Sequence, residues 1–226
     1  MKTLLRVMPI IALFWTGSSS LVQAADDVAL TKHNLSSTQA TAGNIRTANT
    51  AFVCGFCHSP HTEAGGPAPL WNRATPAGPF TMYASPTMDM TIAGAPASIS
   101  LACLSCHDGV VAFDQLINAA GSGGYNIAAP SQGWAFTDGA AAVANTMTGV
   151  ANIGSVLTGD HPISVTYDPT ADTAFQPLAT VQAALQLYGA GEDQVECASC
   201  HNPHEATNAT FLRVGIDTLC TTCHIK

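Results

Sequence analysis

The sequence predicts a mostly irregular fold, with few short helices and strands, that its apolar side chains alone cannot order. Residues 119–159 are rich in Gly, Ala, Ser and Asn and have no helical or strand period. Elsewhere in the chain, the segments that have a helical or strand period are short. All eight cysteines fall into four closely spaced pairs. Because ordering a backbone costs about 1–2 kcal/mol per residue, such a chain needs a core from another source.

A few segments do have a period. Residues 98–118 are compatible with a helix that runs through the second cysteine pair and breaks near Asp108-Gly109. Residues 163–167 alternate like a short strand. Residues 180–188 predict an amphipathic helix that stops at Gly189 or Gly191. We expect the 119–159 region to be loop.

The N-terminus has the pattern of an export signal. Lys2 and Arg6 give a positive start, Val7–Trp15 is a short apolar stretch, and Val22-Gln23-Ala24 is a small-x-small cleavage site. Residues 1–24 are therefore a predicted signal peptide, and Ala25 is the expected mature start. The apolar stretch is shorter than the roughly 20 residues that span a bilayer, and no later segment is long and apolar enough either.

Charge excludes one class of partner. Loss of the two basic residues of the signal changes the formal charge from −8 to −10. The five basic residues that remain are too few for the basic face that nucleic acid requires. Only 10% of residues are charged, against about 25% in typical domains. The surface that results tolerates contact with other proteins.

Each cysteine pair is spaced Cys-x-x-Cys, and a histidine follows each pair directly. The four motifs are Cys54-Gly-Phe-Cys57-His58, Cys103-Leu-Ser-Cys106-His107, Cys197-Ala-Ser-Cys200-His201 and Cys220-Thr-Thr-Cys223-His224. This spacing is the signature of covalent c-type haem attachment. Two thiols three residues apart share one face of a helical turn, so they reach two vinyl groups on one porphyrin edge. The histidine then lies under the iron as the proximal ligand.

Three other interpretations compete. Two Cys-x-x-Cys pairs can bind zinc, one pair can be a redox dithiol, and eight cysteines in an exported chain can form disulfides. None of them explains the histidine after every pair, or the absence of cysteines outside the pairs. We therefore expect four covalently bound haem c groups, which supply the core of the fold. Apo-protein should then be largely unfolded.

The histidine count matches four irons with two imidazole ligands each. Besides the four proximal histidines, the chain has four others: His33, His61, His161 and His204. We expect these four as distal ligands. Methionine is the rival axial ligand, but the remaining methionines are interpreted as side chains that pack on haem.

Two distal candidates lie three residues after a proximal histidine. His61 follows His58, and His204 follows His201, each with a proline between them. A residue so close cannot reach the opposite face of the same porphyrin, but it can reach the iron of an adjacent haem. The alternative is a hydrogen bond to a haem propionate.

The spacing suggests two haem pairs in one domain. A Cys-x-x-Cys-His-x-Pro-His cluster occurs at 54–61 and again at 197–204, and each is followed by a plain motif. We therefore expect residues 25–226 to form a single tetrahaem domain, with one pair in 25–125 and the other in 126–226.

The chain resembles the doubled-CXXCH multihaem c-type cytochromes, and among them the extracellular tetrahaem nanowire cytochromes of the OmcE type. Besides the four motifs, the stretches that carry the resemblance are His33-Asn34-Leu35, Pro69–Arg73, Asp160–Ser164 and Phe211–Arg213. The resemblance implies bis-histidine electron carriers. It also implies that Trp71 and Phe211 pack on haem, and that Arg73 and Arg213 pair with propionates.

Three functions follow as hypotheses. The first is an extracellular conduit in which copies of the chain polymerise into a conductive filament. The second is a soluble periplasmic carrier that works as a monomer. The third, a multihaem reductase, needs an iron with an open position. Four spare histidines for four haems leave none, so we expect no enzyme.

Overall fold

The computed structural model describes residues 28–60, 67–121, 125–126 and 128–225. The predicted signal peptide, the expected mature start Ala25 and the distal candidate His61 lie outside these residues. Turns and irregular segments dominate the described chain, which confirms the predicted fold class. Its regular elements are short.

The helices and strands are the following. The α-helices are α1 (Ser98–His107), α2 (Leu178–Ala184), α3 (Cys197–Cys200) and α4 (Ile216–Cys223). The 3-10 helices are η1 (Val28–Leu30), η2 (Cys54–Phe56), η3 (Gly149–Ala151) and η4 (Ala209–Phe211). The strands are β1 (Ile45–Arg46), β2 (Phe136–Asp138), β3 (Ala141–Val143), β4 (Val165–Thr166) and β5 (Gln194–Val195).

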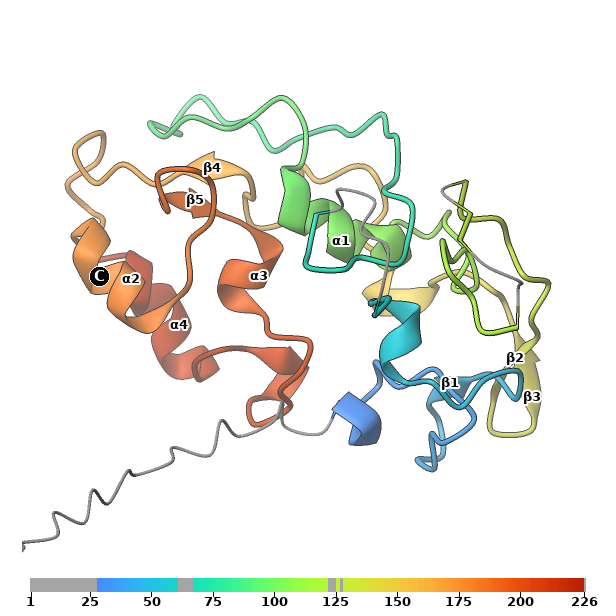
Figure 1. Ribbon diagram of the computed structural model, residues 1–226. Coiled ribbons are helices and arrows are strands. Elements are labelled where there is room, and N and C mark those ends of the chain that lie inside the picture. Colours follow the sequence, from blue (N-terminus) through green and yellow to red (C-terminus); the bar gives the residue numbers. More distant parts are fainter. Residues whose placement is uncertain (1–27, 61–66, 122–124, 127, 226) are drawn as a thin grey trace, which may run out of the picture.

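These elements form two small groups with a helix pair between them. The antiparallel sheet β1-β2-β3 lies on one side, while β4, β5, α2 and α4 lie on the other (Figure 1). Helix α1 packs against α3 between the two groups, and α2 packs against α4. The four cysteine motifs are on η2, α1, α3 and α4, so the second and third lie between the two groups and the fourth lies in the group that contains α2.

Helix α1 begins where the sequence predicts and ends at the predicted break. Gly109 has a φ of 72°, in the left-handed region that favours glycine, and a Cβ there would displace the Asn152 side chain, which would lie within 2.3 Å of it. The prediction that the helix continues to residue 118 is wrong. Asp108 accepts the N–H groups of Val110 and Val111 at 2.9 Å each, and this turn directs the chain away from the helix axis.

The prediction that 119–159 is entirely loop is also wrong. Strands β2 and β3 form a hairpin, and β2 pairs with β1 as well. Gly139, at a φ of 62°, makes the turn. The signal was present in the sequence, because Asp138-Gly139 between Phe136 and Val143 is a hairpin dipeptide between apolar residues.

The last two predicted elements are shorter than expected. The strand predicted over 163–167 is reduced to β4, and the helix predicted over 180–188 is α2, which ends at Ala184. Leu185 is extended, with φ −127° and ψ 147°. The chain leaves the helix there because Tyr188 forms a bridge with Gln194, so tertiary pairing overrides helical propensity.

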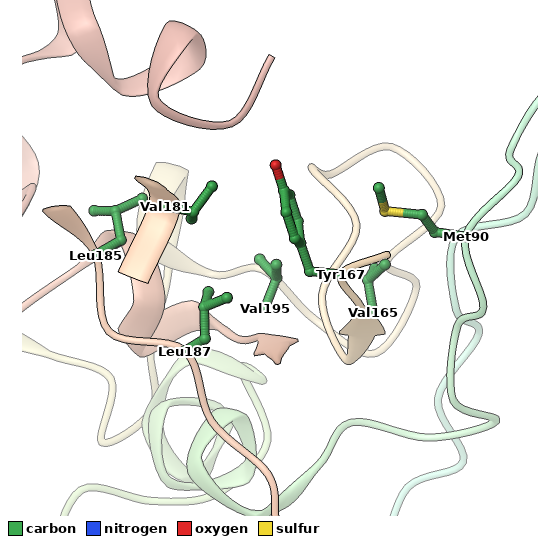
Figure 2. Close-up of a cluster of buried hydrophobic side chains, with 7 residues drawn as sticks. All are labelled: Met90, Val165, Tyr167, Val181, Leu185, Leu187 and Val195. Atoms are coloured by element: carbon green, nitrogen blue, oxygen red, sulfur yellow. The ribbon is translucent and has the colours of Figure 1, made fainter. Parts of the chain in front are cut away.

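Two apolar clusters surround the motifs. The first consists of Met90, Val165, Tyr167, Val181, Leu185, Leu187 and Val195 (Figure 2). The second consists of Phe56, Phe113 and Phe136. Cysteines of the motifs pack against both: Cys223 against the first, and Cys57 and Cys106 against the second. Among the described residues, no helix is both long and apolar enough to cross a bilayer.

Candidate functional site

Every motif is a helical turn that its own histidine closes. The backbone N–H of His58 donates to the Cys54 carbonyl at 2.8 Å. His201 and His224 make the equivalent bonds to the first cysteine of their motifs, at 3.0 and 2.9 Å, and His107 is the last residue of α1. Helical geometry therefore puts both thiols on one face, as the sequence predicts.

A second segment holds the first motif in place. The residue after His58 donates its N–H to the Leu70 carbonyl, and the N–H of Asn72 donates to the Cys57 carbonyl, both at 2.8 Å. His58 Nδ1 lies 2.7 Å from the Pro69 carbonyl oxygen. We call this segment, Pro69–Asn72, the first clamp.

The third motif has the same clamp. The residue after His201 donates its N–H to the Phe211 carbonyl, and the N–H of Arg213 donates to the Cys200 carbonyl, both at 2.8 Å. His201 Nδ1 lies 2.8 Å from the Thr210 oxygen. Leu70 and Phe211 occupy equivalent positions, and both have positive φ, at 53° and 62°. The first and third motifs are thus held by segments with the same backbone geometry, which their sequences do not reveal.

The fourth motif has the two backbone bonds as well. Ile225 donates its N–H to the Ala174 carbonyl at 2.7 Å, and Gln176 donates to the Cys223 carbonyl at 2.8 Å. Phe175 lies between these two bonds, bridged to His224, with its ring 4.4 Å from the His224 ring. The sequence does not reveal that these segments hold the motifs, because the bonds use backbone atoms, which any residue can supply.

The clamps also select the histidine tautomer. Nδ1 of His58, His107 and His201 lies 2.7–2.8 Å from a carbonyl oxygen, which for His107 belongs to Ala151. A carbonyl only accepts, so Nδ1 carries the proton and Nε2 keeps its lone pair. This is how proteins orient a metal-binding histidine. The three imidazoles are therefore prepared as ligands through Nε2.

Two proximal histidines each face a distal candidate. The rings of His58 and His204 are 6.1 Å apart between centroids, with an interplanar angle of 19°. Those of His33 and His107 are 6.3 Å apart, at 67°. A metal–imidazole bond is about 2 Å long and the ring centre lies about 1 Å beyond, so two trans imidazoles have centres about 6 Å apart. Both pairs thus have the spacing of two ligands on one iron.

Burial keeps these distal candidates neutral. Burial, together with the neighbouring His107, lowers the pKa of His33 to about 4. Burial and then His58 lower the pKa of His204. A histidine binds a metal through its neutral form, so both are in the required state at neutral pH. His33 Nδ1 is buried without a hydrogen-bond partner in the described chain.

A large cavity joins the other motifs. Its volume is about 1020 Å³. The cysteines and histidines of the second, third and fourth motifs that line it are Cys103, His107, Cys197, Cys200, His201, Cys220, Cys223 and His224. His161 lines the same cavity, as do Met88 and Met90. The site therefore has room for large planar groups, with thiols and imidazoles around them.

The motifs follow one another in space in the order of the sequence. Burial raises the pKa of Cys57 in the first motif to about 12, and the nearby Cys106 thiol of the second motif makes a smaller contribution to the rise. The hydrogen bond to Cys197 of the third motif, then burial, raises the pKa of Cys103. Burial, then Cys200 of the third motif, raises the pKa of Cys223 in the fourth to about 11. Thiols of successive motifs are thus close neighbours.

These thiols do not suit the competing interpretations. Reactive dithiols and zinc ligands need thiolates, and hence lowered pKa values, whereas burial raises the pKa of Cys57, Cys200 and Cys223. The hydrogen bond from Cys103 of another motif lowers the pKa of Cys197, but Cys200, the partner of Cys197 in its own pair, has a raised pKa. All eight cysteines are free of disulfides. In the described residues, no group of three or more His, Cys, Asp or Glu side chains converges on a metal site. Thioether formation, which needs no converging cluster, fits the arrangement.

Arg73 does not do what the resemblance implies. It is 2% exposed, and four of its five N–H groups are bound to the Ser105 hydroxyl and to the carbonyls of Ser105, Ala112 and Phe113 at 2.7–3.1 Å. The expected propionate pair is therefore wrong for Arg73, which instead ties the first clamp to the second motif. Arg213 Nε likewise donates to the Ala198 carbonyl of the third motif, at 2.7 Å.

The aromatic side chains implied by the resemblance do lie beside the histidines. The Trp71 ring is 5.9 Å from His58 and nearly perpendicular to it, and the Phe211 ring is 4.4 Å from His33. Trp71 Nε1 is buried without a hydrogen-bond partner among the described residues. A haem beside His58 brings carboxylate acceptors, so the unpartnered donor fits such a group.

The fold and the site define a class of protein: short helices, each ending in a haem-attachment motif, with imidazole pairs and a common cavity. A family model described as the doubled CXXCH motif matches residues 190–226, which contain the third and fourth motifs. The match supports a multihaem c-type cytochrome. No curated protein matches the chain. The motifs indicate covalently bound c-type haem, whose role in proteins of this class is electron transfer.

Proposed function

We propose that this chain is an exported tetrahaem c-type cytochrome that transfers electrons outside the cell as part of a homopolymeric filament. The observation that carries the proposal is the order of the motifs. Each motif lies next to its successor, and the first cysteines of the first and last motifs, Cys54 and Cys220, are exposed. A line of haems held this way runs from one surface of the chain to another.

The proposal includes a ligand set. His58 and His204 bind the first iron, and His107 and His33 bind the second, as their ring spacing supports. His201 and His224 are the proximal ligands of the third and fourth irons. His161, which lines their cavity, and His61 remain as the distal ligands. Bound haem supplies reversible one-electron chemistry, while the chain orients the imidazoles, packs the porphyrins and excludes water from them.

The first prediction concerns haem content. The mature protein should contain four covalent haems, because four complete motifs use every cysteine. A pyridine haemochrome assay and the intact mass measure this. The mass should equal that of residues 25–226 plus four haems, and titration of the native protein should find no free thiol. A deficit of one haem or more contradicts the assignment.

The second prediction concerns assembly. His33 lies against His107 within the chain, so His61 is the candidate for binding an iron of a neighbouring subunit. A shared bond of this kind fixes subunits head to tail, and a heterologous contact that does not close forms an open helix. Electron cryo-microscopy of material sheared from cells should show filaments, and His61→Ala should abolish them while His33→Ala should not.

Exposed apolar side chains near the first and last motifs allow a matched test of the contact between subunits. Phe52, two residues before the first motif, is 68% exposed, and Ile216, at the start of α4, is 65% exposed. Phe52→Ser and Ile216→Ser should weaken polymerisation. Val150→Ser, a fully exposed apolar position beside the second motif, should have no effect.

A monomeric periplasmic carrier is the second candidate, because both histidine pairs of the described residues are internal to one chain. It is the correct one if the wild type stays monomeric at high concentration with all four haems six-coordinate. A reductase requires a haem with a displaceable ligand, which a high-spin signal in the wild type would reveal.

A further inference from the structure

One buried carboxyl lies where the second and third motifs meet. Glu196 is 1% exposed, immediately precedes Cys197, and lines the motif cavity. Helices α1 and α3 pack against each other here, and the thiols of Cys103 and Cys197 are hydrogen-bonded. A haem on either motif would therefore have its attached edge close to this carboxyl.

The partners of Glu196 are neutral. Its Oε2 accepts hydrogen bonds from the hydroxyls of Ser100, at 2.5 Å, and Ser164, at 3.0 Å. Its Oε1 is buried without a hydrogen-bond partner in the described chain. Ser100 Oγ also accepts the Cys197 N–H at 3.1 Å. The backbone N–H of Ser199, inside the third motif, also donates to the Glu196 side chain, so the carboxyl is linked to both motifs.

No described cation pairs with this carboxyl. The titratable groups that interact with it are the Cys197 thiol and the Tyr188 hydroxyl. The Cys103 thiol lies beside Cys197, and Arg213 lies beside Tyr188. Arg213 Nε is bound to the Ala198 carbonyl, and the Tyr188 hydroxyl also donates to that carbonyl, at 3.4 Å. In the haem-loaded protein both thiols become thioethers, which do not titrate. Arg213 then remains as the described cation nearest this junction, and the iron of a bound haem adds a charge that changes with its oxidation state.

We propose that Glu196 takes up a proton when the haem of the second or third motif is reduced, which couples proton binding to electron transfer at this junction. The inference rests on the proposed haem function. In this step the iron gains one electron, from a neighbouring haem or an added reductant, and passes from ferric to ferrous. The carboxylate gains one proton from solvent and becomes a carboxylic acid.

The physical reason is the low dielectric around the group. Burial raises the pKa of the Glu196 carboxyl, and the hydrogen bonds from Ser100 and Ser164 oppose this rise. Ferric haem carries one more positive charge than ferrous haem, so reduction removes a charge that favours the carboxylate. The pKa is then higher in the reduced than in the oxidised protein. Between these two values, the haem potential falls as pH rises.

The first test is Glu196→Gln, which keeps the shape and removes the titration. Spectropotentiometric titration across pH should show that one or two wild-type haems lose potential as pH rises. In the variant those haems should keep the low-pH potential at every pH. Glu192→Gln, the same change at an exposed residue, should behave like the wild type. An unchanged pH dependence in Glu196→Gln overturns the proposal.

The second test separates Glu196 from haem propionates, which also titrate. The chain has four glutamates, so ¹³C-glutamate marks few carboxyls when unlabelled 5-aminolaevulinate is supplied with it to keep the haem propionates unlabelled. Redox-difference infrared spectra should show a protonated carboxyl band that appears on reduction and shifts with the label. Its absence from the wild type overturns the proposal, even where Glu196→Gln loads haem poorly. If the wild type contains four haems but its spectra lack this band, the proposed function stands and only this inference is overturned.

Discussion

Replacing both cysteines of the second motif by serine should remove more than one haem and unfold much of the chain. The cavity that three motifs share has a volume of about 1020 Å³. Apolar side chains such as Leu104, Leu157 and Val165 line it, and they lose their packing partners when a haem is removed. The cavity therefore does not persist without its contents.

The second motif should be the most sensitive of the four because both neighbours depend on it. Arg73, which extends from the first clamp, binds Ser105 inside this motif, and α1 packs on α3 of the third motif. In the double variant Cys103→Ser/Cys106→Ser, we expect fewer than three haems per chain. Near-ultraviolet circular dichroism should be largely lost.

The matched control is the same pair of changes in the fourth motif. Cys220 is exposed, and α4 lies at the end of the described chain, with α2 as its helical neighbour. Cys220→Ser/Cys223→Ser should therefore leave three haems and a folded protein. Equal losses in the two double variants, measured by haemochrome assay and thermal melting, would contradict a central role for the second motif.

Replacing His33 or His204 by alanine should convert one haem each from low-spin to high-spin, because each imidazole faces a proximal histidine at ligand spacing. The two ligand pairs differ in the angle between their rings, at 67° and 19°. Parallel imidazole planes separate the energies of two iron d orbitals, whereas crossed planes leave them nearly equal. The second iron should therefore have the more anisotropic electron paramagnetic resonance signal.

The two variants should thus remove different signals. His33→Ala should remove the highly anisotropic low-spin signal and leave the rhombic one, and His204→Ala should do the reverse. Glu205→Gln, next to His204, is the control and should preserve both. A variant with an unchanged spectrum shows that its histidine is not a ligand. A near-infrared sulfur-to-iron band in the wild type would instead indicate methionine ligation.

Sequence alone determined the chemistry because that chemistry is local. Two thiols and an imidazole within five residues define an attachment site whatever surrounds them, and each motif indeed forms one helical turn. Helix α1 was predictable to its end for the same reason, since Gly109 stops it. The spare histidines could be counted, although their partners could not be assigned.

Only the tertiary structure decided how these sites are held and connected. The clamps use backbone atoms, so Pro69–Asn72 and the segment around Phe211 share a geometry without sharing residues. Arg73 was expected at a propionate, but three carbonyls and a hydroxyl enclose it. The dipeptide Asp138-Gly139 marks the hairpin at Phe136–Val143, but the pairing of this hairpin with β1, about 90 residues earlier in the chain, does not follow from that signal. Contacts between residues far apart in sequence also bring Glu196 to Ser100 and His204 to His58. Local pattern determines what each segment can bind, and packing determines which segments meet.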